Sequence, residues 1–107
     1  MAKYKTNEVI VLSALEEDLL TVLMGKGEQY GLKILEIVNQ ARQLYKIPEL
    51  KIGSLYPTLQ RMEKQNLIVS QQLECRRYYS ITAYGRDALT STNAYRKQLA
   101  EYSGDLI

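Results

Sequence analysis

The spacing of apolar residues in the first half of the chain predicts two helices. The first begins at Ser13, which forms a capping box with Glu16, and ends at residues 25–27, where two glycines permit a left-handed turn. The second is expected from about Gly31 to Tyr45, because its apolar positions recur at helical spacing and Pro48 prevents a further turn.

A third helix is predicted after a very short strand at residues 50–52. Ser54 is expected to cap this helix, with Pro57 in its first turn, where the missing N–H does no harm. Helical spacing then separates two faces. The core-facing positions are Leu55, Leu59 and Met62. The solvent-facing positions are Pro57, Gln60, Arg61 and Lys64, flanked by Ser54 and Thr58.

Two strand-like segments, residues 67–73 and 77–81, are separated by only a few residues and therefore predict a β-hairpin. Strand alternation places Tyr79 and Ile81 on one face, which we expect to meet the core. The predicted turn between them carries Cys75 and Arg76.

A last helix is predicted from a cap at Thr82 to about Tyr102. The expected order is helix, helix, short strand, helix, hairpin, helix, which is that of a winged helix-turn-helix with an added C-terminal helix. We therefore predict a mainly α fold with a small β-hairpin (α+β). Residues 1–82 would form a winged-helix DNA-binding domain and residues 83–107 a C-terminal dimerisation helix.

Composition excludes several kinds of chemistry. The 107 residues include no histidine and one cysteine, so the usual zinc ligand sets, the commonest general base and an internal disulfide are all excluded. Phosphate-binding and nucleophile-elbow motifs are missing too, and no apolar run is long enough to span a bilayer. We expect a cytoplasmic protein that is not an enzyme, does not span a membrane and needs no metal or other cofactor.

Positive charge is concentrated in one part of the chain. The net charge is only +2, but residues 51–86 hold six Lys or Arg residues against two acidic ones, an excess of +4. This segment contains the third helix and the hairpin, so the excess is typical of a surface that contacts DNA phosphates. Charges gathered on a solvated face, or solubilising charge on an exposed hairpin, would give the same excess.

Several motifs in this region resemble the PadR-like transcriptional regulators. They are Ile52–Glu63 with its Leu-Tyr-Pro element, Asn66–Ile68, Arg77–Thr82 with its Arg-Tyr-Tyr element, Gly85-Arg86, and Tyr30-Gly31 ahead of Ile34. The resemblance covers residues 15–89. It implies a winged-helix repressor that forms dimers through its C-terminal helix, with Tyr56 and Pro57 at the DNA surface and two arginines in the wing.

Two features differ from much of that family. The wing is shorter and lacks a Gly-Arg tip, and a single C-terminal helix resembles the family's short members. The predicted DNA contacts are Lys51, Ser54, Tyr56, Pro57, Thr58, Gln60, Arg61, Lys64, Arg76 and Arg77. Among these, Arg61 is suited to a bidentate base contact or a phosphate contact, and the lysines to phosphates.

The last helix carries a heptad seam, with spacings of four and three residues in turn. Its members are Ala88, Thr92, Tyr95, Leu99, Tyr102 and Leu106. A seam of this length favours a dimer interface, and packing against the first helix through Tyr84 and Leu89 is the alternative.

Together these features predict a homodimeric transcription regulator, a repressor that binds a pseudo-palindromic site in double-stranded DNA. Two other functions stay open at this point. The fold could serve as a protein-interaction module whose basic face meets an acidic partner, or as a regulator with an effector pocket at the dimer interface.

Overall fold

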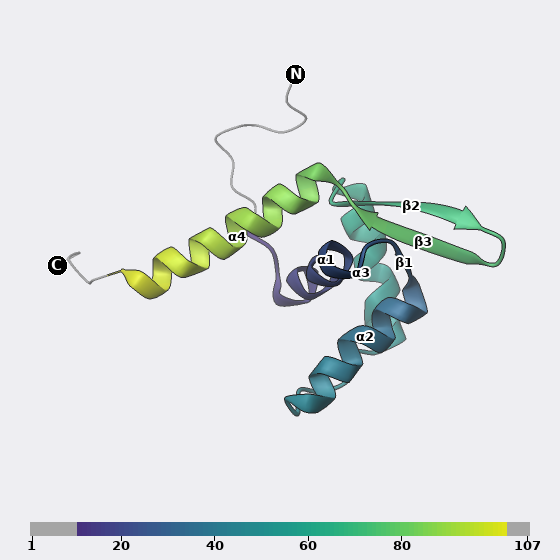
Figure 1. The fold of residues 1–107 in the computed structure, drawn as a ribbon, viewed down its shortest axis with the longest axis horizontal. Coiled ribbons are helices and arrows are strands. Elements are labelled where there is room, and N and C mark those ends of the chain that lie inside the picture. The colour runs from purple at the N-terminus through teal and green to yellow at the C-terminus, as the bar shows by residue number, and fades with distance from the viewer. Residues whose placement is uncertain (1–10, 103–107) are drawn as a thin grey trace, which may run out of the picture.

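The computed structural model describes residues 11–102, which form helices around a small antiparallel sheet (Figure 1). The elements in chain order are α1 (Ala14–Lys26), β1 (Gln29–Tyr30), α2 (Gly31–Leu44), α3 (Ile52–Lys64), β2 (Ile68–Leu73), β3 (Arg76–Ile81) and α4 (Ala83–Glu101). This is the mainly α, winged-helix architecture that the sequence predicts. No helix within the described residues is long and apolar enough to cross a membrane.

The first helix begins where the sequence predicts. Ser13 Oγ accepts a hydrogen bond from the Glu16 N–H, and the Glu16 carboxylate accepts one from the Ser13 N–H at 2.9 Å, so both halves of the capping box are formed. The helix ends at Gly27, whose φ of 81° lies in the left-handed region that favours glycine.

The short strand lies elsewhere than predicted. Residues 50–52 form no strand, and the two-residue strand β1 instead directly precedes α2. The Asn39 side chain explains the difference, because it accepts from the Leu50 N–H at 2.8 Å and donates to the Leu50 carbonyl at 3.0 Å. The backbone groups that a strand partner would use are thereby already bonded, and the Leu50 side chain is buried in the core.

The third helix begins three residues earlier than predicted. Lys51 is its N-cap, without a side-chain cap hydrogen bond, so the prediction that Ser54 caps the helix is wrong. Pro57 is consequently the sixth helical residue rather than a first-turn residue. Its missing N–H leaves the Gly53 carbonyl without the usual partner four residues on. The predicted core face is confirmed, since Leu55, Leu59 and Met62 are fully buried.

The three strands lie in the order β1-β3-β2, both pairs antiparallel. Leu73 pairs with Arg76, so β2 and β3 form a hairpin whose turn is the two residues Glu74 and Cys75, with Glu74 at a φ of 54°. The hairpin projects from the body as the wing (Figure 1). As predicted, Tyr79 is buried and Ile81 packs against the core.

The first half of α4 packs on the body, and its second half projects away (Figure 1). Thr82 caps the helix by accepting from the Gly85 N–H at 2.9 Å. Thr92 Oγ1 accepts from the Leu12 N–H at 3.1 Å, and the Leu12 carbonyl accepts from Arg96 at 3.3 Å. The chain that enters α1 is therefore fastened to α4.

Candidate nucleic-acid interface

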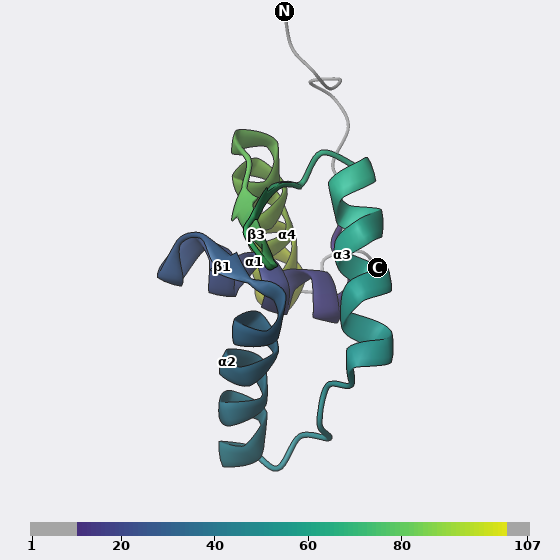
Figure 2. The ribbon, with the colours of Figure 1, turned by 90° about the vertical axis from the view of Figure 1, so that its right-hand side faces the viewer.

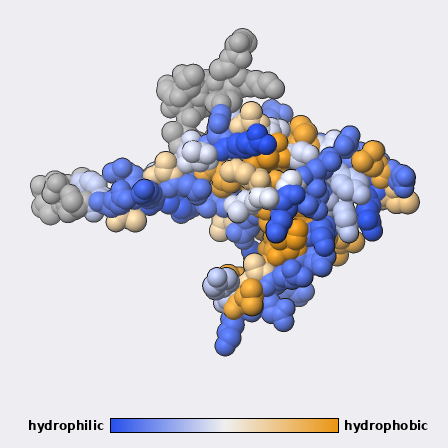
Figure 3. All heavy atoms as spheres, viewed as in Figure 1, coloured by the Kyte–Doolittle hydropathy of each residue, from blue (hydrophilic) through white to orange (hydrophobic). Residues whose placement is uncertain are grey.

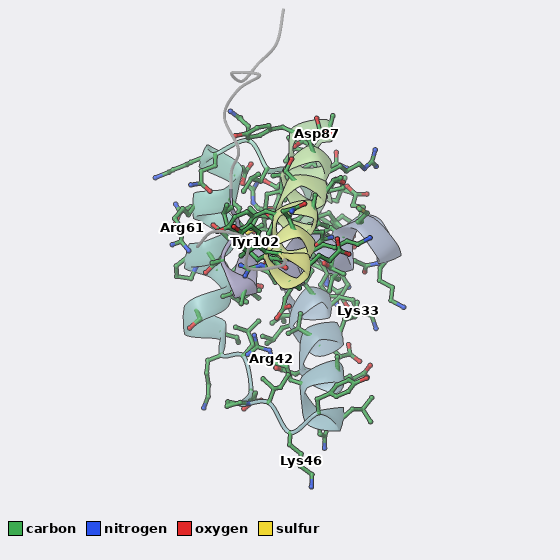
Figure 4. The ribbon with its side chains drawn as sticks, turned by 90° about the vertical axis from the view of Figure 1, so that its left-hand side faces the viewer. Lys33, Arg42, Lys46, Arg61, Asp87 and Tyr102 are labelled. Carbon is green, nitrogen blue, oxygen red and sulfur yellow. The ribbon has the colours of Figure 1, made fainter. Side chains whose placement is uncertain are left out.

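α3 lies along an outer edge of the molecule, beside α2 (Figure 2). Figure 4 shows Arg61 on the side of α3 that is turned away from α2 and α4. The exposed predicted contacts on this helix and its cap are Lys51, Ser54, Tyr56, Pro57, Gln60, Arg61 and Lys64. The structure thus brings together a polar and basic face opposite the buried one.

Thr58 does not belong to this face. Its side chain is only 5% exposed, and its hydroxyl donates to the Ser54 carbonyl at 2.7 Å. The prediction that Thr58 faces DNA is therefore wrong. Its polarity suggested exposure, but its hydrogen-bonding capacity is satisfied within the helix.

Tyr56 links α3 to the start of α2. A Cβ atom placed on Gly31 would lie 2.5 Å from the Tyr56 hydroxyl oxygen and 2.6 Å from a ring carbon, so the ring occupies the space that a side chain would need. Gly31 is the first residue of α2 and is buried. Through this contact α3 packs closely against the first turn of α2.

The two wing arginines lie on opposite faces of the hairpin. Strand alternation separates neighbouring side chains, and Arg76 and Arg77 are adjacent in β3. The guanidinium of Arg76 stacks over the Tyr30 ring, 4.1 Å from its centroid, and Tyr78 meets the same ring edge-on at 5.7 Å. Arg76 is therefore a strand residue held against the N-cap of α2 and not part of the turn.

Arg77 points to the other side, where it is connected to α3. Its Nη1 donates to Ser70 Oγ at 2.9 Å, and that hydroxyl donates to Glu63 Oε2 at 2.8 Å. Tyr30, Ser70 and Glu63 were not assigned to this site in the sequence analysis. The strand register would have indicated Ser70, because it pairs with Tyr79 and therefore lies diagonally across from Arg77 on the same face.

Charges around the base of the wing act on one buried phenol. Burial raises the pKa of Tyr79, and the neighbouring Tyr56 and Glu63 raise it further, whereas Arg77 lowers it. Tyr79 therefore stays neutral at physiological pH and serves as a core residue below the basic face.

The heptad seam of α4 divides into two parts. Ala88 and Thr92 are buried within this chain, which overturns their assignment to a dimer interface. Tyr95, Leu99 and Tyr102 are 44%, 56% and 46% exposed on the projecting half, which is mostly hydrophilic with small hydrophobic patches on the side shown in Figure 3. Leu106 lies outside the described residues. Packing against α1 through Tyr84 and Leu89, the alternative, accounts for the first part.

Comparison with protein-family models gives one match that covers most of this architecture. Residues 19–91 match the model of the transcriptional regulator PadR-like family. This range runs from α1 through the helix-turn-helix and the wing into α4.

Two curated relatives are similar to the chain. A homolog of outer membrane protein assembly factor BamC from Haemophilus influenzae is 29% identical over 97 residues, covering 91% of this chain and 44% of that protein. Transcriptional regulator Rv3488 from Mycobacterium tuberculosis is 44% identical over 52 residues, covering 45% of this chain and 49% of that protein. The chain thus spans less than half the length of each.

Solved structures share the fold. H. salinarum RosR is 28% identical with a TM-score of 0.65, covering 88% of this chain and 80% of that one. F93 from STIV, a winged-helix DNA-binding protein, has a TM-score of 0.71 at 12% identity, covering 87% and 98%. At that identity the likeness to F93 concerns the fold alone.

Proposed function

The chain belongs to the PadR-like family of transcriptional regulators, and from that premise we propose that it binds double-stranded DNA as a homodimer and represses transcription. The proposed site of action is the cytoplasm, and the proposed operator is pseudo-palindromic.

The outer face of α3 carries this proposal. In a helix-turn-helix the second helix enters the major groove, and here that helix is α3, with one face fully buried and the other polar and exposed. Arg61 lies on the exposed side and is turned away from the rest of the molecule (Figure 4). Its guanidinium suits a bidentate contact with guanine.

We assign the surrounding residues by their chemistry. Lys51 and Lys64 at the two ends of α3 are proposed phosphate contacts, because ammonium groups are point charges without the planar geometry of base recognition. The other proposed contacts from α3 are Ser54, Tyr56, Pro57 and Gln60. Arg76 and Arg77 would contact the backbone from the two faces of the wing.

We further propose that residues 1–82 act as the DNA-binding part and residues 83–107, which include α4, as the dimerisation part. The exposed side chains of Tyr95, Leu99 and Tyr102 on the projecting half of α4 support this, because a second copy would cover them. A dimer with twofold symmetry presents two copies of α3, and a pseudo-palindromic site matches that symmetry.

Selection of bound duplexes from a random pool by the purified protein tests this function. We expect an enriched motif with two inverted half-sites, one helical turn or a multiple of it apart. Retention of random duplex without any enriched motif would contradict sequence-specific regulation. An enriched motif without inverted symmetry would contradict the dimer but not DNA recognition.

A further inference from the structure

Glu63 is out of place on a helix that meets DNA. It is the only acidic residue within α3, and its carboxylate is next to the basic face proposed to contact phosphates. A carboxylate there repels the DNA backbone and weakens binding. The contacts that Glu63 makes must therefore offset this repulsion if the proposed interface is right.

Those contacts lead directly to the wing. Glu63 Oε2 accepts a hydrogen bond from the half-buried Ser70 hydroxyl at 2.8 Å, and Ser70 Oγ accepts from Arg77 Nη1 at 2.9 Å. The three residues come from α3, β2 and β3. Because the serine donates to a carboxylate and accepts from a guanidinium, both bonds are charge-assisted and oriented in one direction.

We infer that Glu63 is a positioning residue for DNA recognition, which acts through Ser70 to hold the Arg77 guanidinium at a fixed place beside α3. This inference rests on the proposed function. One N–H of the guanidinium is used by Ser70, and its other donors remain for a phosphate oxygen. The wing and α3 then approach DNA as one unit, with their relative position set before binding.

The arrangement favours specific over non-specific binding. The negative charge of Glu63 partly cancels the long-range attraction of Arg77 for any phosphate, which lowers affinity for all sequences alike. The hydrogen bonds, in contrast, order the Arg77 side chain before DNA binds, so binding costs less side-chain conformational entropy. This saving is realised only with DNA whose geometry fits the fixed arrangement. Removing the link should therefore reduce discrimination more than it reduces overall affinity.

Ser70→Ala is the most direct variant, because it breaks the link and leaves every charge in place. The test compares the Kd for a duplex selected by the parent protein with the Kd for a random-sequence duplex, each over a range of salt concentrations. Ser70→Ala should weaken binding to the selected duplex about tenfold and leave the random duplex unchanged. Ser70→Thr keeps the hydroxyl and should behave as the parent does.

Other variants separate charge from position. Glu63→Gln retains an acceptor for Ser70 but removes the charge, so it should strengthen binding to the random duplex. Arg77→Ala should weaken binding to both duplexes, and adding Ser70→Ala to it should have no further effect. Gln71→Ala is the matched control, because its amide donates to Glu28 at 3.0 Å on the other face of the hairpin. It should leave the preference for the selected duplex unchanged.

Three results would overturn the inference in a folded protein. In the first, Ser70→Ala keeps the parent's full preference for the selected duplex. In the second, the effects of Ser70→Ala and Arg77→Ala on binding free energy are additive. In the third, Ser70→Thr loses the preference to the same degree as Ser70→Ala. The last would mean that packing at position 70, not its hydroxyl, sets the wing. Failure of the parent to bind any duplex would instead overturn the proposed function, and the inference with it.

Discussion

Replacing Leu99 by glutamate should convert the protein from a dimer to a monomer without unfolding it. Leu99 is on the projecting half of α4, is 56% exposed, and is flanked on the seam by Tyr95 and Tyr102. A second copy that covers this surface would bury the leucine, whereas the isolated chain gains little from it. The substitution therefore acts on association and not on the core.

The size of the effect follows from the exposed fraction. Burying a whole leucine side chain is worth about 1.5–3 kcal/mol, so covering the 56% of Leu99 that is exposed gives about 0.8–1.7 kcal/mol per copy. Twofold symmetry doubles this to about 1.7–3.4 kcal/mol, or roughly 15- to 300-fold in the dimer Kd, for removal of the side chain. Glutamate adds the desolvation of two opposed charges, so its effect exceeds that range.

Light scattering and sedimentation at several micromolar concentrations measure the mass of each variant. Leu99→Glu should be a folded monomer where the parent is a dimer. Thr92→Ala is the matched control on the same seam, because it removes the acceptor for the buried Leu12 N–H and should lower the free energy of unfolding by about 1–3 kcal/mol while the protein remains dimeric. A folded dimer of Leu99→Glu would refute the assignment of the exposed seam.

Three further predictions concern individual residues. Gly31→Ala should lower the free energy of unfolding by about 1–3 kcal/mol, because its Cβ would lie 2.5 Å from the Tyr56 hydroxyl oxygen and 2.6 Å from a ring carbon. Tyr56→Ala should relieve much of this loss in a urea-unfolding double-mutant cycle, and a fully stable Gly31→Ala would contradict the contact. The raised pKa of Tyr79 contributes stability that is complete below the ordinary tyrosine pKa of 10.0 and is lost as pH rises above it. Tyr79→Phe should therefore reduce the loss of stability at alkaline pH in unfolding measurements, and an unchanged pH dependence would contradict this. Cys75→Ser in the exposed turn should bind DNA as the parent does, both reduced and after mild peroxide; a peroxide effect confined to the parent would indicate a redox sensor.

Local sequence signals predicted the elements whose ends are set by nearby residues. The capping box of Ser13 and Glu16 and the cap at Thr82 define helix starts within one turn, and both are formed in the structure. The core face of α3 follows from spacing alone. Thr58 fits that spacing too, since it lies three residues after Leu55 and four before Met62. It was assigned to the exposed face because it is polar, but its hydroxyl donates to the carbonyl of the preceding turn, which allows the residue to be buried.

Features that depend on tertiary contacts could not be predicted from the sequence. Asn39 prevents a strand at Leu50 from a position eleven residues away, and nothing local to Leu50 indicates this. The heptad seam could not reveal that Thr92 packs on this chain while Leu99 does not, because the spacing is the same on both parts. The link from Glu63 to the wing likewise required the register of the hairpin.

Binding of Arg61→Ala to DNA tests the proposed interface most directly. Lys97→Ala is the control, because it removes one positive charge from the exposed surface of α4, away from α3 and off the seam. With a duplex selected by the parent and a random duplex, Arg61→Ala should lose about 1–3 kcal/mol of discrimination at one base position, while Lys97→Ala should retain the parent's preference. If a folded Arg61→Ala binds both duplexes as Lys97→Ala does, the outer face of α3 is not the surface that reads DNA.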